Sequence, residues 1–162
     1  MLDSSSFQAL GDFPERLERL YQAVPAGLRQ WAPASWEGMP SESFTALEQV
    51  CHLRDIEIDG YQVRFRRLLD ESRPCLPSLD GYALARERDY AHADAGEALH
   101  AFRAARIRTV ALLRGLGEAQ WRRDGEYEGG PVTALGLAHY LCSHDQQHLA
   151  GLHWLLARIS GR

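Results

Sequence analysis

A long apolar stripe near the end of the chain constrains the fold more than any other feature. From Val132 to Ile159, one face repeats at helical spacing and reads Ala134, Leu137, Leu141, His144, His148, Leu152 and Leu155. The pattern predicts a helix of about 28 residues, about 40 Å long at the usual rise per residue. Such a helix must bury its apolar stripe against other elements of the chain.

Three further segments are expected to form amphipathic helices, namely residues 13–24, 45–71 and 94 to 115 or 117. Asp12 can cap the first, with Pro14 in its first turn. Thr45 and Glu48 form a capping-box pattern that opens the second, and Asp94 opens the third in the same way.

The connections between these helices are long, and none has a pattern strong enough to predict a sheet. They cover residues 31–40, 72–92 and 118–131, and all are rich in turn-forming residues. A long connection in a small domain needs a purpose, and we expect 72–92 to cover one end of the bundle. The sequence therefore predicts an all-α fold, a four-helix bundle with long inter-helix connections, in a single domain over residues 1–162.

Composition excludes several classes of function. The net charge of −4 argues against a nucleic-acid partner, which would require excess positive charge. All 18 basic residues are arginine, so a lysine Schiff base and a Walker A loop are both impossible. Three cysteines without a CxxC pair favour a reducing compartment. With neither a signal peptide nor an apolar run of about 20 residues, we expect a cytoplasmic protein without a membrane partner.

Two histidines on the long helix are the first candidates for chemistry. His144 and His148 are four residues apart and therefore share one helix face, where two imidazoles can reach one metal ion. They could equally form hydrogen bonds in a core or face solvent. His52, near the start of the second helix, can supply a third ligand. Three histidines leave a coordination position open, as a catalytic metal site requires.

The HxxxH spacing also occurs in zinc proteases, where a glutamate follows the first histidine as general base. Here that position holds Asp145, whose shorter side chain disfavours this interpretation. Asp145 can instead orient an imidazole or join two helices. The remaining histidines lie off the stripe or near the third helix, and we expect structural or surface roles for them: His92, His100, His139 and His153.

Three segments together resemble the DinB-like superfamily: Phe44–Glu57, Leu76–Tyr82 and Leu137–Leu149. This superfamily of metal-binding bundles of the DinB/YfiT type includes metal-dependent hydrolases and thiol-dependent S-transferases. The resemblance implies a four-helix bundle with a metal near one end. It places the ligands on His52, His144 and His148, with zinc or nickel as the expected divalent ion, and it makes a homodimer plausible.

The leading functional hypothesis is transfer of a low-molecular-weight thiol to an electrophilic small molecule, in detoxification or stress response. A thiol bound at the open position would lose its proton to form a thiolate. Related proteins use bacillithiol or mycothiol, as the resemblance implies. Arginines of the second helix can hold a carboxylate on such a thiol, or they can form a solvated face: Arg54, Arg64, Arg66 and Arg67.

Two alternatives remain open at this point. A metal-dependent hydrolase would use metal-bound water, with Asp55, Glu57 or Asp145 as the general base, although the sequence favours none of the three. A non-enzymatic metal-binding stress protein would have a closed site. Cys51 and Cys142 are interpreted as small core residues rather than as nucleophiles.

Overall fold

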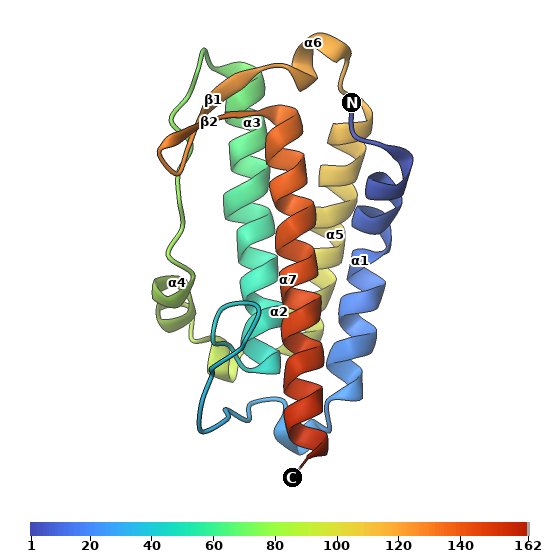
Figure 1. Ribbon diagram of the computed structural model, residues 1–162, viewed down its shortest axis with the longest axis vertical. Coiled ribbons are helices and arrows are strands. Elements are labelled where there is room, and N and C mark those ends of the chain that lie inside the picture. The colour runs from blue at the N-terminus through green and yellow to red at the C-terminus, as the bar shows by residue number, and fades with distance from the viewer. Residues whose placement is uncertain (162) are drawn as a thin grey trace.

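The computed structural model describes residues 1–161 and contains a bundle of four long helical rods (Figure 1). The rods are α1 (Ser4–Ala23), α2 with α3 (Ala46–Asp55 and Gln62–Asp70), α5 (Ala95–Arg114) and α7 (Ala134–Ser160). A π-helical turn, η2 (Ile56–Tyr61), joins α2 to α3 without a break. The α2–α3 rod packs on α5 and α7, and α1 packs on the same two helices. The predicted four-helix bundle is confirmed.

The direction of the rods explains the longest connection. In Figure 1, α1 and α7 run downward, whereas α2–α3 and α5 run upward. Since α3 and α5 are parallel, the chain between them must return the length of the bundle. Residues 71–94 therefore run along its side, with α4 (Gly81–Glu87) and the 3₁₀ turn η3 (Tyr90–His92) on the way. The expectation that this segment covers one end of the bundle was wrong.

The first helix begins nine residues earlier than predicted. Asp3, not Asp12, is the cap, and its side chain accepts a hydrogen bond from the Ser6 backbone N–H at 3.0 Å. Pro14 consequently lies inside the helix, where it cannot donate to the carbonyl of Leu10. Arg106 of α5 donates to that carbonyl instead, at 3.3 Å. A contact from another helix thus compensates for a proline that the sequence alone suggests is a helix start.

The second rod begins as predicted, but a π-helical turn then shifts which side chains face the core. The capping box of Thr45 and Glu48 is present, with both hydrogen bonds formed. The π turn adds a residue to one helical turn and rotates the following side chains. Within this turn Ile58 is only partly buried, while Ile56 and Gly60 are buried.

The loop before α7 contains a small sheet that the sequence did not predict. After the short helix α6 (Glu118–Trp121), strands β1 (Asp124–Tyr127) and β2 (Gly130–Thr133) pair antiparallel. Glu128 and Gly129 have φ of 52° and 78°, the left-handed conformation that a tight two-residue hairpin turn needs. Strands of four residues are too short to show a reliable alternation of apolar and polar residues. A further 3₁₀ turn, η1 (Ala26–Leu28), follows α1.

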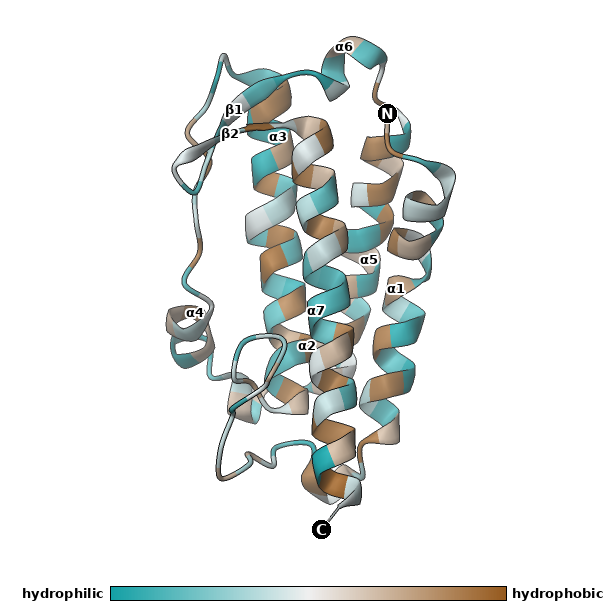
Figure 2. Cartoon of the chain, viewed as in Figure 1, coloured by the Kyte–Doolittle hydropathy of each residue, from teal (hydrophilic) through white to brown (hydrophobic). Residues whose placement is uncertain are grey.

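The bundle has two apolar clusters, separated at mid-length by a layer of buried polar residues. One cluster contains Leu68, Leu137 and Leu141, and the other contains Val50, Leu53 and Leu152. Figure 2 shows the corresponding hydrophilic stretch in the middle of α7. The layer consists of Gln49, His52, Asp55, Glu57, Arg106, Thr109, Asp145 and His148. In the described part of the chain, no helix is both long and apolar enough to cross a membrane.

Candidate metal centre

The three histidines predicted as ligands meet in this polar layer. His144 and His148 lie one turn apart on α7, with ring centroids 4.5 Å apart. The His52 ring, from α2, lies 5.4 Å from the His144 ring and 4.9 Å from that of His148. His52 and His148 are buried, and His144 is partly exposed. The resemblance implied a metal near one end of the bundle, but the histidines lie near mid-length of α7.

The ring nitrogens point at one another with the spacing of metal ligands. The Nε2 atom of His144 lies 3.3 Å from that of His52 and 3.2 Å from that of His148. Two nitrogens bound to one tetrahedral zinc at about 2.0–2.1 Å would be separated by about 3.3–3.4 Å. Without a cation or protons between them, three lone pairs this close would repel one another. The donor set therefore fits a divalent ion.

Glu42 completes a four-residue group that the sequence did not predict. Its carboxylate oxygens lie 3.5 Å from Nε2 of His52 and 3.3 Å from Nε2 of His148. One ligand atom from each of the four residues lies within 4.8 Å of all the others. Imidazole nitrogen and carboxylate oxygen are both common zinc ligands. Glu42 is in an irregular loop after Pro40, where no periodic pattern marks it.

The loop that carries Glu42 is held against α7 by two close contacts. Trp36 stacks on Trp154 of α7, with ring centroids 6.2 Å apart. At Gly151, one turn after His148, a Cβ atom would lie only 2.3 Å from the Ser41 hydroxyl oxygen. Glycine at this position therefore lets the loop approach the helix. The approach brings Glu42 to the histidines.

Gln49 fixes the orientation of His148. It is fully buried on α2, and its Oε1 lies 3.0 Å from Nδ1 of His148. Its amide nitrogen donates to the carbonyl of Phe44 at 3.4 Å, which assigns the oxygen to the histidine side. Nδ1 of His148 must then donate, and the neutral ring presents its Nε2 lone pair to the centre. Such outer contacts typically orient metal-binding histidines.

The electrostatics of the site favour unprotonated ligands. Burial, and then the neighbouring His148, lowers the pKa of His52 to about 4. Burial and the other two histidines place the pKa of His144 well below its ordinary value. Burial alone would raise the pKa of Glu42, but contacts with His148 and His52 hold it below its usual range. At neutral pH the centre therefore combines the neutral imidazoles of His52 and His144 with the Glu42 carboxylate.

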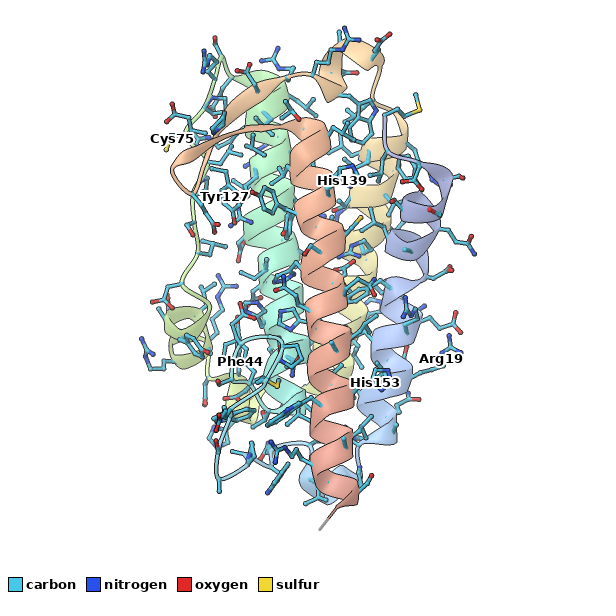
Figure 3. The ribbon with its side chains drawn as sticks, in the orientation of Figure 1. Arg19, Phe44, Cys75, Tyr127, His139 and His153 are labelled. Atoms are coloured by element: carbon cyan, nitrogen blue, oxygen red, sulfur yellow. The ribbon has the colours of Figure 1, made fainter. Side chains whose placement is uncertain are left out.

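Aromatic and small residues enclose the centre. The Phe44 ring lies 5.2 Å from the His52 ring, and Figure 3 shows Phe44 beside α2. Gly81, the first residue of α4, approaches His52 so closely that a Cβ there would lie 2.8 Å from the imidazole Cε1. Nδ1 of His52 is buried and has no hydrogen-bond partner among the described residues. The Tyr61 ring lies 5.9 Å from the His144 ring.

A buried ion-pair cluster braces the helix behind the histidines. Arg106 of α5 donates to both Asp145 carboxylate oxygens, at 2.6 and 2.9 Å, and to Glu57 at 2.9 Å. Burial would lower the pKa of Arg106, but the two carboxylates raise it on balance. Asp145 directly follows His144, so the cluster fixes the helix turn that carries a predicted ligand. Asp145 thus joins two helices, one of the two roles the sequence allowed it.

The other histidines named in the sequence analysis are exposed, and the two cysteines named there are thiols that stay protonated at neutral pH. His92, His100, His139 and His153 are exposed, and Figure 3 shows the last two at separate levels of α7. Burial raises the pKa of both Cys51 and Cys142 to about 11, which suits core residues better than nucleophiles.

Comparison with known proteins places this geometry in a family. One similar solved structure has the description "YfiT from Bacillus subtilis is a probable metal-dependent hydrolase with an unusual four-helix bundle topology". The likeness has a TM-score of 0.82 at 24% sequence identity and covers 99% of this chain and 91% of that one. None of the curated proteins compared with the chain matches it. Residues 9–152 match the DinB superfamily, and the chain therefore belongs to this superfamily.

Proposed function

We propose that the protein is a metal-dependent enzyme in which His52, His144 and His148 hold one divalent ion, zinc or nickel. The observation that carries the proposal is the convergence of three Nε2 atoms, with neighbouring pairs 3.2 and 3.3 Å apart, beside a carboxylate. Three protein nitrogens leave a position for a reacting molecule, which distinguishes a catalytic site from a closed structural one.

Glu42 is the general base in this proposal. The three carboxylates suggested by the sequence are all occupied elsewhere. Asp55 accepts from the Tyr90 hydroxyl at 2.6 Å and pairs with two arginines, while Glu57 and Asp145 bind Arg106. Glu42 faces the histidines from a loop and keeps 35% of its side-chain surface exposed, so it can exchange protons with solvent.

The reaction we place first is transfer of a low-molecular-weight thiol to an electrophilic small molecule. A bound divalent ion would stabilise the thiolate form of a thiol beside it. Glu42 accepts the S–H proton, and the sulfur then attacks an electrophilic carbon. A C–S bond forms, the bond to the leaving group breaks, and the leaving group departs with the electron pair and receives the proton from Glu42. Burial keeps Cys51 and Cys142 protonated, so the sulfur comes from a second molecule.

Hydrolysis is the second candidate, because the similar YfiT structure is described as a probable metal-dependent hydrolase. The same residues would serve, with Glu42 accepting a proton from water instead of from a thiol. The two candidates differ in what the open position binds, which makes them separable by spectroscopy.

The test uses tag-free protein loaded with cobalt(II). Titration with a small thiol such as 2-mercaptoethanol is expected to produce a thiolate-to-cobalt charge-transfer band. The absence of a band with any thiol would overturn thiol transfer and leave hydrolysis. The variant Glu42→Gln is expected to keep the metal but to need a higher pH for the same band. If Glu42→Gln instead loses the metal, Glu42 is a ligand and not the base.

A further inference from the structure

Two arginines of the described chain are almost completely buried, and they differ in one respect. Arg106 and Arg64 have exposed fractions of 1% and 2%. Arg106 pairs with two carboxylates. Within the described residues, no carboxylate oxygen lies within 4.0 Å of the Arg64 guanidinium. A buried charge without a counter-ion is costly, so the surroundings of Arg64 need an explanation.

Arg64, on α3, has only weak partners in the protein. Its Nε donates to the carbonyl of Pro77 at 3.0 Å. Its guanidinium carbon lies 5.2 Å from the centre of the Tyr61 ring and 4.6 Å from that of Tyr127. The two terminal nitrogens donate no hydrogen bond to a described residue, yet they are not sealed from solvent as Nε of Arg106 is. Arg64 therefore keeps terminal donors that no described residue accepts from, although only 2% of its surface is exposed.

Arg64 lies close to the candidate metal centre, with Tyr61 in contact with both. The Tyr61 ring that contacts the guanidinium also lies 5.9 Å from the His144 ring. Since the guanidinium carbon lies 5.2 Å from the centre of the Tyr61 ring, it is at most about 11 Å from the centre of the His144 ring. At Gly60, a Cβ would come within 3.2 Å of an Arg64 terminal nitrogen, so glycine leaves room for this placement. Figure 3 shows Tyr127 beside α3, the helix that carries Arg64.

We propose that Arg64 binds a carboxylate of the thiol substrate while the sulfur lies at the metal centre. The inference rests on the proposed thiol transfer and names the substrate class. A guanidinium suits this task because its fork of donors matches a carboxylate with two parallel hydrogen bonds. Tyr61 and Tyr127 hold the cation through their ring faces until the anion arrives.

The distance limits the size of the ligand. One residue of extended chain spans at most about 3.3–3.6 Å. The sulfur at the metal centre and the carboxylate at Arg64 must therefore lie somewhat less than 11 Å apart. A carboxylate one or two residues beyond a cysteine matches this separation. A thiol of dipeptide size fits, whereas 2-mercaptoethanol can occupy the metal centre without reaching Arg64.

The test compares two probes that differ only in charge, N-acetyl-Cys-Gly and its C-terminal amide. Each is titrated into the cobalt-loaded protein, and the charge-transfer band gives its dissociation constant. The wild type is expected to bind the acid about 10- to 100-fold more tightly than the amide. Arg64→Met is expected to bind both probes equally, and Arg64→Lys to keep part of the preference. Arg66→Met, an exposed position on the same helix, is the matched control.

The outcomes separate this inference from the function on which it rests. If neither probe produces a band, thiol transfer itself fails. If both probes bind the wild type with equal affinity, only the role of Arg64 is refuted, and this comparison needs no variant to fold. A preference for the acid that persists in Arg64→Met would assign carboxylate binding to another residue and also refute the inference.

Discussion

Replacement of Gln49 by methionine tests the orientation of the ligands without touching one. Methionine keeps a side chain of similar length but cannot accept the 3.0 Å hydrogen bond from Nδ1 of His148. The ring then loses the contact that selects its tautomer, and the tautomer with a proton on Nε2 cannot bind a metal through that nitrogen. Loss of such an outer contact typically weakens metal binding about 10- to 100-fold, which corresponds to about 1.4–2.7 kcal/mol.

The assay is competition for Zn²⁺ between a chromophoric chelator and the tag-free protein, at constant pH. Gln147→Met is the matched control, since Gln147 is exposed and its amide nitrogen donates to Ser143 of the same helix. Circular dichroism checks that both variants fold. We expect Gln49→Met to lose affinity and Gln147→Met to keep it. Equal affinity in Gln49→Met and wild type would refute the role assigned to the hydrogen bond.

Three further predictions follow from the same geometry. Arg106→Met leaves two buried carboxylates unpaired and is expected to lower the free energy of unfolding by about 3–5 kcal/mol, measured by urea denaturation. The exposed Arg103→Met is expected to lower it by less than about 1 kcal/mol. Similar losses in both variants would contradict the importance of the cluster. Gly81→Ala forces a Cβ against His52 and is expected to weaken Zn²⁺ binding by at least about 10-fold. Gly11→Ala, which has open space around its Cβ, should not alter Zn²⁺ binding. Unchanged affinity in Gly81→Ala would contradict the role assigned to the close approach of α4 to His52. Because the pKa of His52 is about 4, its ring is neutral at pH 6, and metal binding displaces no proton from it. A residue-specific NMR titration of the metal-free protein should therefore show no protonation of the His52 ring between pH 7.5 and 6, and titration of that ring with a pKa near 6.5 would contradict the shift.

The sequence predicted the four-helix bundle and the shared face of His144 and His148 because both follow from local periodicity. His144 and His148 are neighbours on one helix by spacing alone, and the stripe around them marks their inward face. The second helix begins where its capping box predicts. These are local properties, and a single chain segment is enough to determine them.

The features that the sequence did not predict depend on contacts between distant segments. Pro14 is tolerated within α1 because Arg106, 92 residues later, donates to the carbonyl that the proline leaves free. Glu42 reaches the histidines only because Gly151 lets its loop approach α7. Arg64 was one of four arginines considered, and only its burial without a carboxylate partner separates it from the others. No short sequence window contains this information.

The most direct test of the metal centre is the metal content of three tag-free proteins after dialysis. Wild type and His139→Ala, which changes an exposed histidine of the same helix, are each expected to retain one divalent ion per chain. His148→Ala is expected to retain none, while circular dichroism shows that it remains helical. Full metal occupancy in folded His148→Ala would contradict the three-histidine centre.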